Sequence, residues 1–155
     1  MHIDENLDGI AFIGFGEAAH AFSSGWEHRP NVRAYDIKLT DETSRQAILD
    51  RCKDAQVTPV KRLAEAVDGA KLIFSLVTAD QALAASEAAA PYLSRGALWL
   101  DCNSCAPQTK ERAANVIEAA GGKYVDVAVM APVHPKRHQA PLLLSGPHAS
   151  EAAWR

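Results

Sequence analysis

The sequence predicts an α/β fold, in which a doubly wound parallel sheet has helices on both faces and forms one domain. Three observations support this prediction. Apolar runs typical of buried strands alternate with segments of helical periodicity, and the connections between them are short. The first apolar run ends in a turn that contains two glycines. An aspartate closes the second apolar run.

The first half of the chain predicts three strands and three helices. The strands are short apolar runs at residues 9–14, 31–36 and 56–60. Pro59 confines the third to a sheet edge or a strand end. The helices are expected at residues 17–26, 41–55 and 62–70. Apolar residues recur every four positions from Ala18 to Trp26, which places them on one helix face. Asp41 and Glu42 are expected at the positive end of the second helix.

The second half predicts four more strands, at residues 71–77, 96–101, 123–130 and 141–146. Thr78 followed by Gln81 matches a capping box, so an alanine-rich helix is expected to begin there and to stop before Pro91. Another helix is expected from Pro107 to the glycine pair that starts at Gly121.

Composition is typical of a soluble globular protein and excludes several classes of function. Of 155 residues, 48% are hydrophobic, and 16 basic against 19 acidic side chains give a net charge of -3. A chain with this balance has no excess of positive charge to attract nucleic acid or an anionic membrane. No apolar run approaches the roughly 20 residues of a membrane helix. Residues 1–8 are expected to form a flexible arm, and because they are acidic and polar they do not resemble a secretory signal. Three cysteines are too few for a disulfide framework, which favours the cytoplasm.

The glycine turn stands between a buried strand and an amphipathic helix, the context in which a turn cradles a dinucleotide pyrophosphate in a Rossmann-type domain. Gly14 permits the tight turn, Gly16 lets backbone N–H groups approach the phosphates, and Ala19 lets helix and strand pack closely. The helix dipole adds positive partial charge. A purely structural strand–turn–helix is the alternative. The cofactor contacts expected here are Gly14, Phe15, Gly16, Glu17 and Ala18.

Asp36 ends the second predicted strand, where a carboxylate would accept hydrogen bonds from the adenosine ribose hydroxyls. Its negative charge would repel a 2′-phosphate, which favours NAD over NADP as the cofactor. Lys38 is a further expected contact, and it opposes this preference because its charge would offset the repulsion.

Three stretches carry a resemblance to a known family. The first, GFGEAA (14–19), matches a glycine turn. The second, DCNSCAP (101–107), matches a segment with an aspartate, then a Ser or Thr, then a proline that opens a helix. The third, YVDVAVMAPV (124–133), matches a strand followed by a substrate loop. Together they resemble the β-hydroxyacid dehydrogenase family, which includes 6-phosphogluconate and 3-hydroxyisobutyrate dehydrogenases, over residues 9–146. Met130-Ala131-Pro132 replaces the usual Ser-Gly-Gly of that loop. An uncharacterised branch of the family carries a similar pattern.

The resemblance implies that residues 9–147 form an NAD(P)-binding domain. It adds cofactor contacts at Val77, Thr78, Asn103 and Ser104 and substrate contacts at Met130, Ala131, Pro132 and His134. In the family, a following helical domain supplies the catalytic lysine and most contacts of a homodimer. Residues 148–155 are expected to start a helix that leads to that domain, which this chain lacks.

Two further motifs leave alternatives open. Cys102 and Cys105 have the CxxC spacing of a redox pair or a zinc half-site, but they are also small enough to be packing residues beside a loop. Residues 134–138, HPKRH, follow the sixth predicted strand, where doubly wound sheets bind ligands. They could bind a substrate carboxylate or phosphate, or form a solvated basic loop. Lys136 and His134 are the only candidates for an acid/base, and no metal site is expected.

The leading hypothesis is therefore an oxidoreductase domain that binds NAD and takes part in hydride transfer with a small β-hydroxy acid or related substrate. A non-catalytic NAD-binding or sensing module is the alternative from another class. An imine-reductase-type relative is a third.

Overall fold

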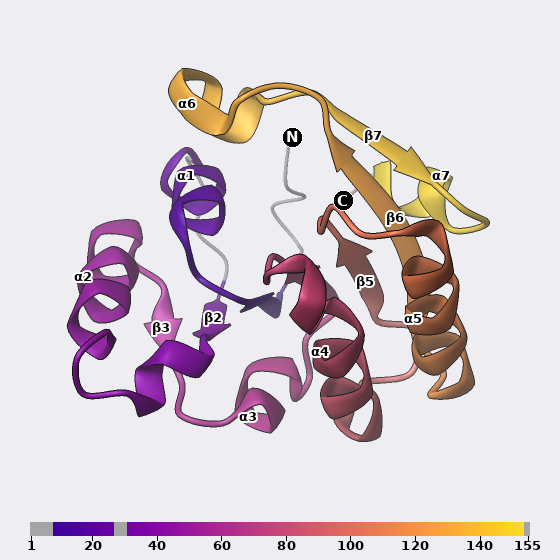
Figure 1. Cartoon of the computed structure of the whole chain (residues 1–155), viewed down its shortest axis with the longest axis horizontal. Coiled ribbons are helices and arrows are strands. Elements are labelled where there is room, and N and C mark those ends of the chain that lie inside the picture. The colour runs from indigo at the N-terminus through magenta and orange to yellow at the C-terminus, as the bar shows by residue number, and fades with distance from the viewer. Residues whose placement is uncertain (1–7, 27–30, 154–155) are drawn as a thin grey trace.

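Seven strands form one sheet in the computed structural model, which describes residues 8–26 and 31–153 (Figure 1). Their order is β3-β2-β1-β4-β5-β6-β7, so the direction of winding reverses between β1 and β4. The strands are β1 (Ile10–Ile13), β2 (Val32–Tyr35), β3 (Thr58–Pro59), β4 (Leu72–Ser75), β5 (Leu98–Asp101), β6 (Lys123–Val129) and β7 (Leu142–Ser145). As predicted, the strand that contains Pro59 lies at an edge.

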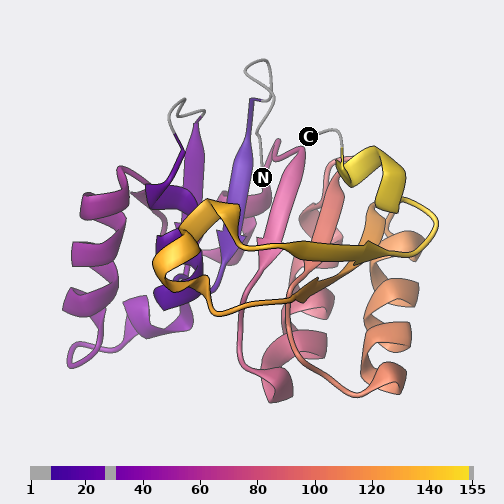
Figure 2. The same cartoon turned by 90° about the horizontal axis from the view of Figure 1, so that it is seen from above.

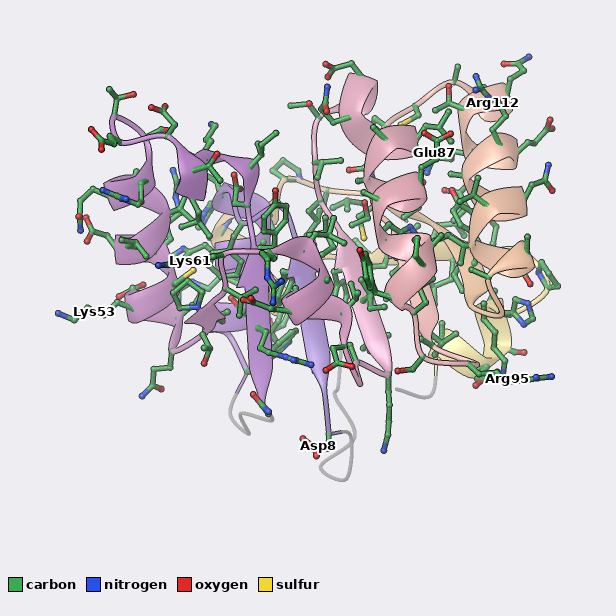
Figure 3. The ribbon with its side chains drawn as sticks, turned by 90° about the horizontal axis from the view of Figure 1, so that it is seen from below. Asp8, Lys53, Lys61, Glu87, Arg95 and Arg112 are labelled. Carbon is green, nitrogen blue, oxygen red and sulfur yellow. The ribbon has the colours of Figure 1, made fainter. Side chains whose placement is uncertain are left out.

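Helices cover both faces of the sheet, as the sequence predicts. Residues Ile10 and Phe12 of β1 face a core shared with α1 and α2, whereas Ala11 and Ile13 face a second core shared with α3, α4 and α5. Seen from below, α4 and α5 lie in front of the strands and carry charged residues such as Glu87 and Arg112 (Figure 3). The helices are α1 (Glu17–Ser24), α2 (Arg45–Ala55), α3 (Leu63–Val67), α4 (Ala82–Ala89), α5 (Pro107–Ala119), α6 (Val133–Lys136) and α7 (Ala149–Ala153).

An aromatic cluster fixes the glycine turn to the first core. The ring of Phe12 stacks on Phe74 at a centroid distance of 5.0 Å and meets Phe15 edge-on at 5.5 Å. Phe15 is fully buried, although it lies in the turn between β1 and α1. Its side chain therefore anchors the turn in the core.

The sheet departs from the all-parallel prediction at its last strand. Strand β7 runs antiparallel to β6, because residues 130–141 between them form a long arm instead of a crossover helix. The arm contains α6 and a 3₁₀ turn, Arg137–Gln139, and packs against α1 (Figure 2). A Cβ on Gly25 would lie 1.9 Å from Nδ1 of His138, so the arm reaches the carboxyl end of α1.

Two helix starts also differ from the prediction. Helix α2 begins at Arg45, because Asp41 lies in a preceding turn where its carboxylate accepts hydrogen bonds from the backbone N–H of Thr43 and the hydroxyl of Ser44. The capping box at Thr78 is wrong: its side chain caps no backbone N–H, and a 3₁₀ turn (Ala79–Gln81) precedes α4.

Part of the predicted organisation lies outside the described residues, including positions 1–7 of the expected arm. A helix does form within residues 148–155, while the proposed domain boundaries remain predictions. In the described part of the chain, every helix is too short or too polar to cross a membrane.

Candidate functional site

A cleft of about 740 Å³ opens where the winding of the sheet reverses, next to the carboxyl ends of β1 and β4. This is the position at which open α/β sheets bind their ligands. Every predicted cofactor contact except Phe15 contributes to its lining: Gly14, Gly16, Glu17, Ala18, Asp36, Lys38, Val77, Thr78, Asn103 and Ser104. The predicted cofactor contacts, which extend from Gly14 to Ser104 in the sequence, therefore lie together around one cleft.

The two glycines of the turn have different roles. Gly14 has a φ of +85°, and a Cβ there would lie 2.3 Å from the carbonyl oxygen of Leu76, so the fold itself requires glycine. Gly16 has an ordinary φ of -83°, and a Cβ there would meet nothing within 4 Å. Because Gly16 is also the N-cap of α1 and makes no side-chain cap, the first N–H groups of the helix remain available to an anion.

The Asp36 carboxylate is held against the glycine turn. One oxygen accepts a hydrogen bond from the backbone N–H of Phe15 at 2.8 Å, and the other accepts one from the backbone N–H of Lys38 at 2.9 Å. Each carboxylate oxygen still has a free lone pair, so the group can accept further bonds from a ribose diol. The predicted contact is thus placed beside the turn and fixed in orientation by it.

The sequence missed about half of the lining, most of it apolar. Ile37 and Leu63 border the cleft near Asp36, and the side chain of Ile37 is 66% exposed. Exposed apolar surface of this kind suits the face of a flat aromatic ring. The missed lining residues are Ile13, Ala19, Tyr35, Ile37, Leu63, Leu76, Ala79, Gln81, Ala84, Ala85, Ala88 and Cys102. The apolar residue directly after Asp36 was the one available signal, whereas nothing in the helix pattern shows that α4 turns its alanines to the cleft.

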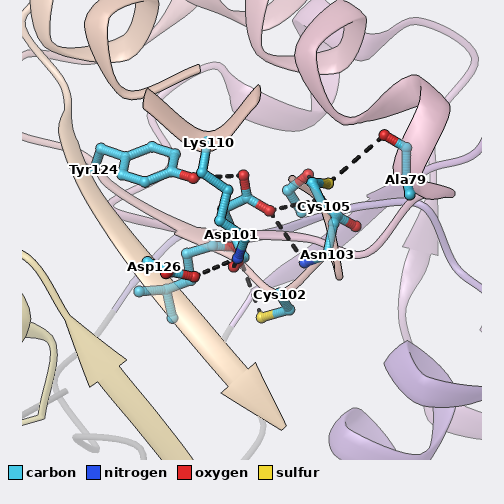
Figure 4. A network of polar contacts seen from close by, with 10 residues as sticks. Ala79, Asp101, Cys102, Asn103, Cys105, Lys110, Tyr124 and Asp126 are labelled. Carbon is cyan, nitrogen blue, oxygen red and sulfur yellow. Dashed lines mark hydrogen bonds and ion pairs between the residues drawn. The ribbon is translucent and has the colours of Figure 1, made fainter. Parts of the chain in front are cut away.

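A buried polar network lies behind the cleft at the end of β5 (Figure 4). One Asp101 oxygen accepts hydrogen bonds from the backbone N–H of Asn103 at 3.0 Å and from its side-chain amide at 2.8 Å. The other accepts one from the Tyr124 hydroxyl at 2.6 Å. Asn103 in turn donates to the Ser75 hydroxyl at 3.0 Å and accepts from the backbone N–H of Val77 at 2.8 Å.

Charged and titratable groups surround this network. Lys110 forms an ion pair with Asp126 and donates to the backbone carbonyl of Asp101 at 3.3 Å. Burial, with the hydrogen bond to Asp101 as a second cause, raises the pKa of the Tyr124 hydroxyl above its usual value. The hydroxyl therefore stays protonated at ordinary pH and remains a donor to Asp101.

The structure favours the packing interpretation of the cysteine pair. Cys102 and Cys105 are both free thiols. Burial raises the pKa of Cys102 to about 12 and also raises the pKa of Cys105. A redox thiol needs the opposite shift, because the thiolate is the reactive form. Among the described residues, no group of three or more His, Cys, Asp or Glu side chains could hold a metal ion.

The predicted substrate and acid/base residues lie on the arm between β6 and β7, and none of them lines the cleft. Met130 is 61% exposed, and His134 and Lys136 are exposed as well. The structure thus brings the predicted cofactor contacts other than Phe15 together around the cleft and places the arm residues outside its lining. The substrate contacts Met130, Ala131, Pro132 and His134 and the acid/base candidates Lys136 and His134 stay predictions.

The reversal of winding, the glycine turn and the acid at the end of β2 define this chain as a dinucleotide-binding domain. The chain belongs to the family described as the NAD binding domain of 6-phosphogluconate dehydrogenase, whose model matches residues 9–153. It is thus an NAD-binding domain of this family, and the resemblance seen in the sequence is confirmed.

Solved structures show the same fold. A conserved hypothetical protein from Sinorhizobium meliloti is 37% identical, with a TM-score of 0.88 over 95% of this chain and 50% of its own. The 3-hydroxyisobutyrate dehydrogenase of Mycobacterium tuberculosis, solved with L-serine, is 19% identical, with a TM-score of 0.76 over 96% of this chain and 50% of its own. A variant imine reductase from Myxococcus stipitatus, in complex with NAD⁺, is 16% identical, with a TM-score of 0.73 over 95% of this chain and 49% of its own.

The chain therefore spans about half the length of the solved structures it matches. No curated protein matches the chain.

Proposed function

We propose that this chain binds NAD for an oxidoreductase that transfers hydride between the nicotinamide and a small β-hydroxy acid or a related substrate. The observation that carries the proposal is the arrangement at the reversal of winding. There Gly16 leaves open space before the first turn of α1, and the Asp36 carboxylate is fixed beside it.

The residues of the cleft fit a dinucleotide along its whole length. The uncapped N–H groups at the start of α1 would bind the pyrophosphate, with help from the helix dipole. Asp36 would accept hydrogen bonds from the adenosine ribose, and Ile37 and Leu63 would flank the adenine. Residues 77–78 and 103–104 would then border the nicotinamide half, because a dinucleotide crosses the sheet at the reversal of winding. When bound, NAD supplies the hydride acceptor.

The acid/base group and the substrate contacts are proposed to lie outside the cleft lining. Lys38 is the only lysine among the lining residues, no histidine is among them, and Lys38 lies on the adenosine side. In the family that this chain resembles, a following helical domain supplies a catalytic lysine and the contacts of a homodimer. We propose the same division of labour for the whole protein, in the cytoplasm, where its three free cysteines would stay reduced.

The lack of an acid/base group in the nicotinamide half of the lining favours one alternative function. A chain that binds NAD without an acid/base beside the nicotinamide could serve as a non-catalytic binding or sensing module. Reduction of imines is a further candidate, and it is supported only by a shared fold.

Titration calorimetry of the chain with NADH and with NADPH tests the proposed cofactor. We expect NADH to bind more tightly by on the order of 1–3 kcal/mol, because Asp36 accepts hydrogen bonds from a ribose diol and repels a 2′-phosphate. Equal affinities, or a preference for NADPH, would show that Lys38 outweighs Asp36. No binding of either nucleotide would refute the proposal itself.

A further inference from the structure

We propose that Asp101 is a positioning residue for the nicotinamide half of the cleft. It acts through Asn103, which holds the backbone that follows β4. This inference rests on the proposed function, because it takes the cleft to be a dinucleotide site. Asp101 does not line the cleft itself, and its side chain is only 1% exposed.

Asn103 joins the two chain segments that border this half of the cleft. Its side-chain oxygen accepts from the backbone N–H of Val77, and its amide nitrogen donates to the hydroxyl of Ser75. A second link runs parallel to it, from the thiol of Cys105 to the carbonyl oxygen of Ala79 at 3.6 Å (Figure 4). The shape of the nicotinamide half therefore depends on how the Asn103 side chain is oriented.

Asp101 determines that orientation. An asparagine amide can rotate by half a turn, which exchanges its oxygen and nitrogen, and the rotated form would present a donor to the N–H of Val77. The Asp101 carboxylate oxygen accepts the hydrogen bond from the amide nitrogen of Asn103, which leaves the amide oxygen for the N–H of Val77. The Tyr124 hydroxyl, which donates to the other carboxylate oxygen, fixes Asp101 in turn.

Comparing two ligands, ADP-ribose and NADH, distinguishes a positioning role of Asp101 from a purely structural one. ADP-ribose carries the adenosine and the pyrophosphate but no nicotinamide, whereas NADH carries all of them. A cluster that only stabilises the fold would affect both ligands alike. A cluster that positions the loops at residues 77 and 103 would affect NADH and spare ADP-ribose.

The experiment compares Asp101→Asn and Tyr124→Phe with the unmodified chain. Both substitutions nearly keep the side-chain volume, and Tyr92→Phe, at an exposed tyrosine outside the lining, is the matched control. Each variant is titrated with ADP-ribose and with NADH by calorimetry. The emission of the bound reduced nicotinamide is recorded, and thermal unfolding is followed in parallel.

We expect Asp101→Asn to weaken NADH about tenfold, the effect of one hydrogen bond to a charged group, and to leave ADP-ribose within about twofold. The emission of bound NADH should move toward that of free NADH. Tyr124→Phe should act in the same direction with a smaller effect, and Tyr92→Phe should have none.

Three outcomes would overturn the inference. Unchanged NADH affinity and emission in both variants would show that Asp101 does not act on the nicotinamide half. A parallel loss of NADH and ADP-ribose affinity would show a structural role alone. An unmodified chain that binds neither ligand would remove the proposed function, and this inference with it. If the unmodified chain binds NADH and both variants bind it equally well, the inference is removed but the proposed function is kept.

Discussion

At the level of single residues, Gly14 and Gly16 show that two glycines in one turn can serve different purposes. A side chain on Gly14 would collide with the carbonyl oxygen of Leu76, whereas a side chain on Gly16 would enter open space at the mouth of the cleft. The fold therefore requires glycine at position 14, whereas the role of Gly16 that we propose is to leave room for the ligand. A sequence motif cannot separate the two roles, because both positions carry the same residue type.

Gly16→Val should abolish measurable NADH binding, because its added methyl groups would occupy the space where the pyrophosphate meets the backbone. The fold should change little, within about 0.5 kcal/mol of unfolding free energy, as for an ordinary surface substitution. Ala106→Val is the matched control, since Ala106 is also an N-cap without a side-chain cap and lies outside the cleft lining. Fluorescence titration and thermal unfolding measure both effects. Normal NADH binding by Gly16→Val would remove the cradle assignment.

Cys52 and Cys102 should resist alkylation by iodoacetamide at pH 8 in the folded protein. Burial raises the pKa of each thiol to about 12, so the thiolate is scarce at that pH. Peptide mass spectrometry after timed labelling, with and without denaturant, measures the rate at each cysteine. Fast labelling of Cys102 without denaturant would restore the redox interpretation of the cysteine pair.

At the level of elements, helix α5 shows how the predicted pattern became structure. Pro107 occupies its first turn, where a missing N–H costs nothing, as the sequence predicts, and the helix buries Ala113 and Ile117 against the sheet. Helix α2 differs, because hydrogen bonds to Asp41 from residues that follow it produce a turn where sequence reasoning placed a helix start. Periodicity detects the body of a helix, whereas its first turn depends on which side chain takes the free N–H groups.

Ile117→Ala should lower the unfolding free energy by about 2–5 kcal/mol, because it leaves a cavity at a fully buried position of α5. Cofactor affinity should persist at temperatures where the variant stays folded, since Ile117 is outside the cleft lining. Val116→Ala on the same helix, at a partly exposed position, should cost clearly less. Urea unfolding with each variant provides the measurement, and equal losses at the two positions would contradict the burial argument.

At the level of the whole molecule, the predicted substrate residues belong to the arm of residues 130–141, which lies outside the cleft lining. It leaves the sheet after β6, packs on α1 and returns as the antiparallel β7 (Figure 2). Among the lining residues that the structure describes, none is an acid/base candidate in the half of the cleft proposed to hold the nicotinamide.

This chain should turn over β-hydroxy acids far more slowly than a form that carries a positioned catalytic lysine. A positioned acid/base contributes roughly 10²- to 10⁴-fold in rate, and the cleft lining offers no group for that task beside the nicotinamide. NADH production is measured over a panel of β-hydroxy acids, for this chain and for a form joined to a lysine-bearing helical domain of a family member. Comparable turnover by both would point to Lys136 or His134 as the acid/base.

The sequence by itself determined the order of strands and helices, the glycine turn and the acid at Asp36. These follow from local rules, because burial on both faces, helical spacing and tight turns each leave a pattern in neighbouring residues. The tertiary structure alone decided the direction of β7, the lining by α4 and the network around Asp101. Each depends on contacts between residues far apart in the chain, such as the 23 positions between Tyr124 and Asp101. No local pattern encodes which distant side chain will complete a hydrogen bond or cover a face.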